Sequence, residues 1–187
     1  YAIRRSRGEL IAFIDSDDIW FSDKLKRQIN YFLKRKISFC YTKYNTIKDG
    51  QIKSGPVLWK DFTFDSYFKK RGICNSTVIV SKKLILSALS KAEYSGYAED
   101  TMLWLLIMEQ GEGAYLFPET HTLYRLAYGS RSRNVIKNAL AVLFLYRRIF
   151  RKPLFMVAMY YPRYISDVIL RRYFKFLLKY LFPSSIS

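Results

Sequence analysis

The stretch AFIDSDDIW, residues 12–20, places three aspartates directly behind a run of apolar residues. The apolar run, residues 10–14, predicts a short buried strand in a sheet that is covered on both faces. Its carboxyl end then carries Asp15, Asp17 and Asp18. Because ligands of open α/β sheets bind at the carboxyl ends of the strands, this stretch predicts a binding site.

Two of these aspartates suggest what the site binds. Asp15 and Asp17 are two positions apart, so their side chains point to the same side if the strand geometry persists. Carboxylates this close repel one another unless a cation neutralises them. Oxygen ligands suit Mg²⁺ or Mn²⁺, which keep several waters and share themselves with substrate phosphates. The alternative is that Asp17 or Asp18 only caps the turn into the next helix.

The segments that follow predict an α/β unit. Residues 22–36 place apolar side chains at helical spacing, which predicts a helix with these residues on its core face: Leu25, Ile29, Phe32 and Leu33. Asp49-Gly50 predicts a hairpin turn between strands at 44–47 and 51–53. A helix at 98–110 ends before Gly111. The other predicted elements are strands at 37–42, 76–80, 115–117 and 121–126 and helices at 61–70 and 82–89.

Charge divides the chain into two parts. The 187 residues carry a formal net charge of +17, of which residues 130–187 contribute 12 basic residues and a single acid, Asp167. This imbalance implies an anionic partner, and nucleic acid, anionic lipid and a phosphorylated substrate all qualify. Cys40 and Cys74 show no metal-binding spacing, so we expect reduced thiols and a cytoplasmic protein.

The tail, residues 133–187, predicts helices. From Ile165 onward, apolar and basic side chains fall on different faces of a predicted helix. Such a helix either lies in the interface of an anionic membrane or packs its apolar face on the preceding domain, and the sequence leaves both open. No stretch approaches the roughly 20 apolar residues that span a bilayer, so no spanning helix is predicted.

Four segments together resemble the family 2 glycosyltransferases, enzymes of the GT-A fold. They are SRGELIAFIDSDDIWFSDKL (6–25), STVIVSKKLI (76–85), YAEDTMLWLLIMEQG (97–111) and YRLAYGSRS (124–132), in the family's order. The resemblance implies a partial GT-A domain over residues 1–132, a mixed sheet flanked by helices, followed by the basic amphipathic helical tail. It also implies that the chain is truncated at its N-terminus, without the early nucleotide-binding strands, and we expect such a chain to have little or no activity alone.

On the donor side, the resemblance assigns Asp17 as the direct ligand of Mn²⁺ or Mg²⁺, with Asp18 as a weaker candidate. Asp15 would contact the donor nucleotide or a metal-bound water. Arg125 would offer positive charge to the leaving diphosphate, since a guanidinium matches phosphate oxygens in pairs.

On the acceptor side, the resemblance makes Asp100 the general base and gives Glu99 the task of orienting it or the acceptor. From the residues alone, acids at a helix start are usually a capping pair. The family often has a His two positions after its Tyr-Arg pair, where this chain has Ala127. The only histidine, His121, is expected to be packed or exposed rather than a ligand.

The implied function is inverting, metal-dependent transfer of a sugar from a nucleotide-sugar donor to a hydroxyl of a saccharide or lipid-linked saccharide, in surface polysaccharide synthesis. The enzyme would be cytoplasmic and peripheral at the inner face of the membrane. The alternatives are a non-catalytic membrane-associated fragment, a metal-dependent phosphatase or nuclease, and a basic nucleic-acid-binding module, the last of which leaves the acidic cluster unexplained.

Overall fold

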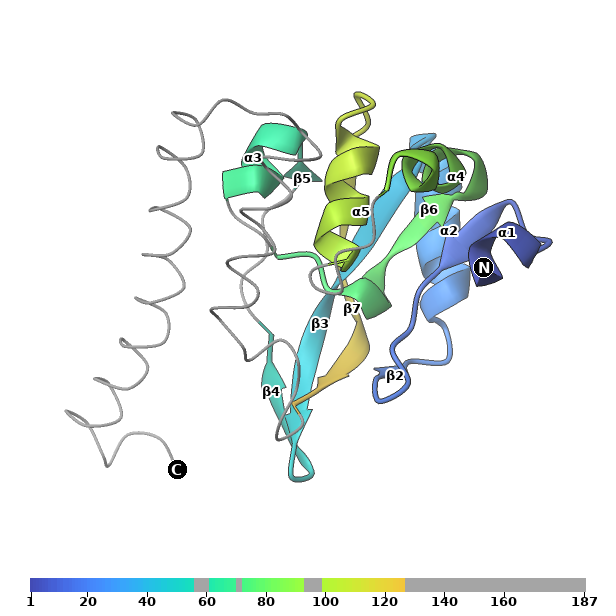
Figure 1. The fold of residues 1–187 in the computed structure, drawn as a ribbon. Helices are drawn as coiled ribbons and strands as arrows, with labels where there is room; N and C mark the ends of the chain where they lie inside the picture. Colours follow the sequence, from blue (N-terminus) through green and yellow to red (C-terminus); the bar gives the residue numbers. More distant parts are fainter. Residues whose placement is uncertain (56–60, 70–71, 93–98, 127–187) are drawn as a thin grey trace. The chain divides into compact units, whose positions relative to one another are not determined.

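The computed structural model describes residues 1–55, 61–69, 72–92 and 99–126 (Figure 1). These residues form a seven-stranded sheet in which five strands follow the order β1-β6-β3-β7-β2, while β4 pairs with β3 and β5 with β7. The strands are β1 (Leu10–Ala12), β2 (Ile19–Trp20), β3 (Phe39–Lys48), β4 (Gln51–Ser54), β5 (Asp61–Phe62), β6 (Ile79–Ser81) and β7 (Ala114–Arg125). The helices are α1 (Ala2–Arg5), α2 (Lys24–Arg35), α3 (Phe64–Lys69), α4 (Lys82–Lys91) and α5 (Glu99–Met108), with a 3₁₀ turn, η1, at Asn75–Thr77.

The sheet is mixed, as a GT-A-like fold requires. β3 and β7 pair in parallel, whereas β1 and β3 both run antiparallel to β6. Two adjacent residues of β3 show how helices cover both faces: Phe39 contacts Trp104 of α5, and Cys40 packs with Phe32 of α2. Because neighbouring strand residues point to opposite faces, α2 and α5 lie on opposite sides of the sheet (Figure 1). The predicted α/β class is confirmed.

The predicted hairpin is present, and the conformation of its two turn residues explains why it forms there. Asp49 and Gly50 both have positive φ, 49° and 78°, and Lys48 pairs with Gln51. Two central residues with positive φ match the right-handed twist of the flanking strands, and Asp-Gly is a favoured pair for them. Two pairs of predicted strands are each one longer strand. The predicted strands 37–42 and 44–47 form β3, which is continuous over ten residues, and the predicted strands 115–117 and 121–126 form β7.

The prediction for the core face of α2 is confirmed for Phe32, which is buried, and for Ile29, which packs against the core, but it is wrong for Leu25 and Leu33. Leu25 and Leu33 are exposed by 39% and 62%, whereas Lys24, Gln28 and Phe32 are buried. These three residues recur every four positions and therefore lie on one face of the helix. The sheet-facing side of α2 is thus largely polar at its N-terminal end and apolar only at its C-terminal end.

The buried polar residues of α2 satisfy one another and their neighbours. Lys24 Nζ donates to Gln28 Oε1 at 2.8 Å and lies 4.1 Å from the centre of the Trp20 ring. Gln28 Nε2 donates to the carbonyl oxygen of Thr77 at 2.9 Å. A cation over an indole and a fully bonded amide keep much of their interaction energy when they leave water. This explains how Lys24 and Gln28 lie on the side of α2 that faces the sheet, where the apolar pattern had placed Leu25 and Leu33.

Helix α5 is buried from Thr101 to Met108, so it shows no apolar stripe. A helix that is apolar all round belongs in the interior of a fold. Its chain reversal ends at Gly111, whose φ is 92° and whose N–H donates to the carbonyl of Met108 at 3.1 Å. The predicted glycine stop is therefore confirmed, with the helix ending slightly earlier than expected.

Two further elements differ from the prediction. The predicted strand 76–80 is split into the turn η1 and the short strand β6, and β5 precedes α3 within the predicted helix 61–70. The helix predicted at 82–89 is confirmed as α4, and Ser81 Oγ caps it by accepting the Leu84 N–H at 3.3 Å. The predicted helical tail, residues 133–187, lies outside the described residues. Within the described ranges, no helix is long and apolar enough to span a membrane.

The buried amine of Lys24 predicts a measurable pH dependence. Burial lowers the pKa of Lys24 from 10.5 to about 8, so the folded protein carries a penalty for the charged amine below pH 8 that disappears as the pH rises to 10.5. Relative to Lys24→Met, the wild-type free energy of unfolding should therefore increase by about 2 kcal/mol between roughly pH 7 and pH 10. Urea unfolding of both proteins measures this difference.

The matched control is Lys34→Met, which replaces an exposed lysine of the same helix. Its difference from the wild type should not change with pH over that range. A wild-type advantage over Lys24→Met that stays constant across the range would show that Lys24 is protonated equally in the folded and unfolded states.

Candidate functional site

Residues 15–18, the acidic turn, reverse the chain between β1 and β2. The Asp18 N–H donates to the Asp15 carbonyl at 3.1 Å, which closes the turn. The Asp15 N–H donates to Ser76 Oγ at 2.9 Å, which ties the turn to η1. β1 ends at Ala12, so the extended geometry does not persist through Asp17 and the prediction that Asp15 and Asp17 share a side loses its premise.

Asp18 anchors the acidic turn. Its side chain is only 8% exposed. Oδ2 accepts the Ser76 hydroxyl at 2.5 Å and Oδ1 accepts the Arg125 N–H at 2.8 Å. Burial raises the pKa of Asp18, with smaller contributions from Asp15 and Asp17, while the two hydrogen bonds oppose the rise. With both oxygens engaged inside the protein, this carboxylate is better suited to holding the turn than to binding a metal.

Asp15 and Asp17 are more accessible. Asp15 is half-buried, and its Oδ1 accepts a hydrogen bond from Asn75 Nδ2 at 2.7 Å. Asp17 is exposed, and within the described part of the chain no hydrogen bond or ion pair reaches its carboxylate. Asp17 is therefore the member of the cluster with both oxygens open to a ligand from solution.

The acidic turn carries three carboxylates, and the groups that donate hydrogen bonds to them are all uncharged. Its carboxylates accept from an amide, a hydroxyl and a backbone N–H, and no described Lys, Arg or His forms an ion pair with them. The described residues also contain no group of three His, Cys, Asp or Glu side chains that could hold a metal. A bound cation would need water or substrate oxygens as well, which is how Mg²⁺ is usually held.

Arg125 joins the acidic turn from the end of β7. Besides its N–H bond to Asp18, its Nε donates to the carbonyl oxygen of Asp17 at 2.9 Å. β2 pairs with β7 through Ile19 and Leu123, which fixes this approach. The guanidinium is thus held beside the turn by a backbone oxygen and does not neutralise a carboxylate.

Asp100 is the second residue of α5, a helix that contacts the chain just before the acidic turn. Trp104, one turn later on the same helix face, packs edge-to-face on Phe13, two residues before Asp15, with ring centres 5.3 Å apart. Burial raises the pKa of the Cys74 thiol, and the nearby charges of Asp18, Asp15 and Asp100 raise it further. Helix α5 and the segment that leads into the acidic turn therefore meet through Trp104 and Phe13.

The helix-start alternative for Asp100 and Glu99 also has support. Both side chains are exposed in the first turn of α5, and Asp100 Oδ1 accepts the Thr101 N–H at 2.6 Å. Acids at this position are stabilised by the helix dipole. This contact leaves a catalytic role open, because an exposed carboxylate can accept a proton while it also caps the helix.

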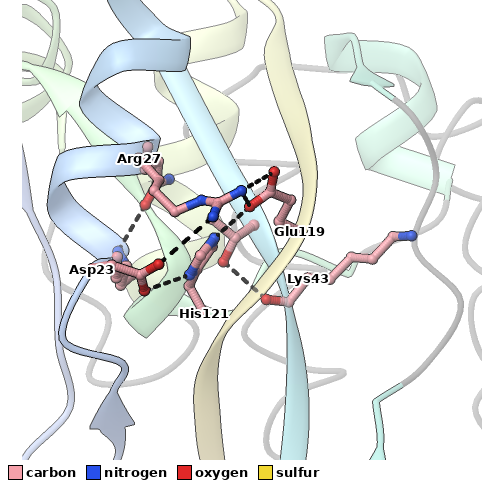
Figure 2. Close-up of polar contacts among 8 residues, drawn as sticks. Asp23, Arg27, Lys43, Glu119 and His121 are labelled. Atoms are coloured by element: carbon pink, nitrogen blue, oxygen red, sulfur yellow. Dashed lines mark hydrogen bonds and ion pairs between the residues drawn. The ribbon is translucent and has the colours of Figure 1, made fainter.

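His121 is packed, and it belongs to a separate cluster (Figure 2). The side chain is 5% exposed and stacks on Phe117. Its Nε2 lies 2.9 Å from Glu119 Oε2, and its Nδ1 lies 3.3 Å from Asp23 Oδ1. Arg27 completes the cluster by contacting Glu119 at 2.6 Å, and hydrogen bonds from Arg27 and His121 lower the pKa of Glu119. The cluster joins the start of α2 to β7.

Sequence reasoning missed Asn75 and Ser76. Both belong to η1 and contact the acidic turn across about 60 positions of sequence. The one local signal was the polar run Asn75-Ser76-Thr77 ahead of an apolar strand. Nothing in that run indicates which distant carboxylates it meets.

Comparison with known proteins points to one family. Residues 1–84 match the family described as Glycosyl transferase family 2. The Escherichia coli protein WfgD, a UDP-Glc:alpha-D-GlcNAc-diphosphoundecaprenol beta-1,3-glucosyltransferase, is 35% identical over 137 residues, which cover 73% of this chain and 53% of WfgD. These matches relate the chain to glycosyl transferase family 2. The chain spans about half the length of WfgD.

Two further proteins are similar to the chain. A protein of Bacillus subtilis (strain 168) named "Putative teichuronic acid biosynthesis glycosyltransferase TuaG" is 28% identical over 173 residues, which cover 91% of this chain and 68% of TuaG. Among solved structures, S. aureus TarS in complex with UDP-GlcNAc superimposes with a TM-score of 0.53 at 11% identity, covering 79% of this chain and 45% of TarS. This likeness shows that the fold is GT-A-like.

The anchoring role of Asp18 predicts a contrast between two variants. Asp18→Ala leaves the buried Ser76 hydroxyl and the Arg125 N–H without their acceptor and should lower the free energy of unfolding by about 1–3 kcal/mol. Asp18→Asn can still accept from Arg125 and donate to Ser76 Oγ, so it should lose less than about 1 kcal/mol. Chemical denaturation measures both. Equal losses in the two variants would show that the turn needs the charge of Asp18 and not only its hydrogen bonds.

Proposed function

We propose that this protein transfers a sugar from a nucleotide-sugar donor, with inversion, to a hydroxyl of a saccharide carried on a lipid diphosphate, in surface polysaccharide synthesis. The observation that carries the proposal is the acidic turn, in which neutral donors hold the carboxylates of Asp15 and Asp18 and leave the Asp17 carboxylate open. The match to the family model supports the reaction class. The names of WfgD and TuaG support the donor, acceptor and pathway class.

The donor half of the reaction rests on the acidic turn and Arg125. Asp17, exposed and open, would bind Mn²⁺ or Mg²⁺, with Asp15 beside it contacting the donor or a metal-bound water. When bound, the cation supplies positive charge to the diphosphate as it leaves. Arg125 adds a guanidinium at the same place and can pair with phosphate oxygens. Asp18 holds the turn in place rather than binding the metal.

The acceptor half rests on the start of α5. Asp100 would take the proton of the attacking hydroxyl while that oxygen approaches the anomeric carbon from the face opposite the nucleotide. Attack from that face inverts the configuration. Glu99, the neighbouring exposed carboxylate, would orient the acceptor or Asp100.

The lipid-linked acceptor suggests where the enzyme works. A saccharide on a lipid diphosphate stays at the membrane surface, so the enzyme must meet it there. The net charge of +11 over residues 130–187 favours an anionic surface, at about 1 kcal/mol for each basic residue close to it. We therefore propose a peripheral protein at the cytoplasmic face of the membrane.

Replacement of the open carboxylate tests the donor half. Asp17→Asn should lower metal-dependent transfer at least about a hundredfold, because loss of even an outer-shell partner of a metal costs 10–100-fold. The measurement is the rate at which the nucleotide diphosphate or the glycosylated acceptor forms, as a function of Mn²⁺ and Mg²⁺ concentration. Asp49→Asn, which replaces an exposed carboxylate that pairs with Lys48 in the hairpin turn, is the matched control and should leave the profile unchanged. Wild-type turnover by Asp17→Asn would remove Asp17 from the site.

Replacement of the proposed base tests the acceptor half. Asp100→Asn should lower kcat about 10²–10⁴-fold, the range of general-base catalysis, because the amide cannot accept the proton. Affinity for the nucleotide-sugar should stay at the wild-type value, since Asp100 is assigned to the acceptor. Rapid-quench assays and calorimetric donor titration separate the two quantities. Loss of donor affinity in this variant would reassign Asp100 to the donor side.

A further inference from the structure

The turn η1 precedes β6, the neighbour of β1 in the sheet, and holds the acidic turn that follows β1. Asn75 Nδ2 donates to the Asp15 carboxylate at 2.7 Å. Ser76 Oγ accepts the Asp15 N–H at 2.9 Å and donates to the Asp18 carboxylate at 2.5 Å. Two consecutive residues thus contact two of the three aspartates, through one backbone group and two side chains.

The hydroxyl of Ser76 has a fixed direction. Since Asp15 N–H already donates to Oγ, the hydroxyl hydrogen is directed at Asp18, which can only accept when ionised. Ser76 is completely buried, and its carbonyl oxygen accepts Trp20 Nε1 at 2.6 Å and Thr122 Oγ1 at 3.4 Å. Ser76 is therefore held by groups from β2 and β7 as well as from the acidic turn.

Asn75 acts on the carboxylate that Ser76 does not reach. Its side-chain nitrogen, and not its oxygen, must face Asp15, because a carboxylate accepts and never donates when it is ionised. The bond engages Oδ1 of Asp15. This contact fixes the direction of the Asp15 side chain while adding no charge to the site.

Neutral donors have a specific consequence in a cluster of three carboxylates. An ammonium or guanidinium on these oxygens would hold the turn but would cancel the charge that attracts a cation. Asn75 and Ser76 hold it and leave its negative charge in place. Partners of this kind, one step behind the ligands, orient metal-binding carboxylates in many sites.

We propose that Asn75 and Ser76 are positioning residues of the cation site, Asn75 by orienting the Asp15 carboxylate and Ser76 by fixing the turn that carries Asp17. This inference rests on the proposed function, because it concerns the same cation. Neither residue is assigned to touch the substrate or to take part in proton transfer.

The experiment measures Mn²⁺ binding by the loss of the free-ion EPR signal, with UDP present as the nucleotide diphosphate. Ser76→Ala and Asn75→Ala should each weaken Mn²⁺ binding about 10–100-fold, the range for outer-shell partners of a metal. Nucleotide affinity in the absence of Mn²⁺ should be unchanged in both. This readout does not depend on turnover.

Thr77→Val is the matched control. Thr77 lies in the same turn, is completely buried, and donates its hydroxyl to the Cys74 carbonyl at 2.7 Å with no contact to the acidic turn. Ser76→Ala and Thr77→Val each remove one buried hydroxyl from η1, so both melting temperatures should fall. Only Ser76→Ala should lose Mn²⁺ affinity. A loss of the same size in Thr77→Val would reduce the effect to general packing and overturn the proposal.

The outcomes separate this inference from the proposed function. If Asp17→Asn loses Mn²⁺ binding while Asn75→Ala and Ser76→Ala keep it, the positioning role is wrong and the cation site stands. If the wild-type protein binds no Mn²⁺ with UDP, the cation site and the positioning role both fall. Should Ser76→Ala fail to fold, Asn75→Ala still decides, because the Asn75 side chain is only half-buried.

Discussion

The bridge made by the Asp18 carboxylate is the interaction on which the rest of the site depends. It joins the acidic turn, the turn η1 and the end of β7, which lie 58 and 107 positions away in the sequence. Burying a carboxylate is unfavourable unless donors meet it, and here the Ser76 hydroxyl and the Arg125 N–H do so. Each of the three segments therefore has its place set by the same two oxygens, and Asp17 and Arg125 meet as a result.

A polar layer beneath the bridge supports it. Trp20 donates to the Ser76 carbonyl and lies under the Lys24 amine, and Gln28 donates to the Thr77 carbonyl. The first two turns of α2 are thus bonded to η1 rather than packed by leucines. An apolar interface of similar size would tolerate sliding, whereas directional hydrogen bonds fix one register. This explains why a helix beside the site buries polar side chains and exposes Leu25 and Leu33.

Local chemistry could be read from the sequence, and long-range pairing could not. The Asp49-Gly50 turn and the helix end at Gly111 depend on backbone conformations that few residue types adopt, so the residue types predict them. The strand before the aspartates was also evident, although it ends at Ala12, two residues earlier than predicted. Lys24 and Gln28 were missed on the core face of α2, because apolar spacing assumes an apolar partner and their partner is the polar turn η1. The contacts of Asn75 and Ser76 could not be predicted, since the sequence does not show which distant acceptor a hydrogen-bond donor will meet in the fold.

The placement of charge around the acidic turn follows one logic. Arg125 is a cation at the acidic turn, yet its guanidinium binds the Asp17 carbonyl and leaves the Asp17 carboxylate open. Had it paired with that carboxylate, the turn would have lost the negative charge that the proposed divalent ion needs. Held on a neutral oxygen, the same guanidinium would keep its charge for the phosphate oxygens of the proposed donor. Negative charge for a metal and positive charge for a diphosphate can then coexist in one site, because each is fixed by neutral partners and not by the other.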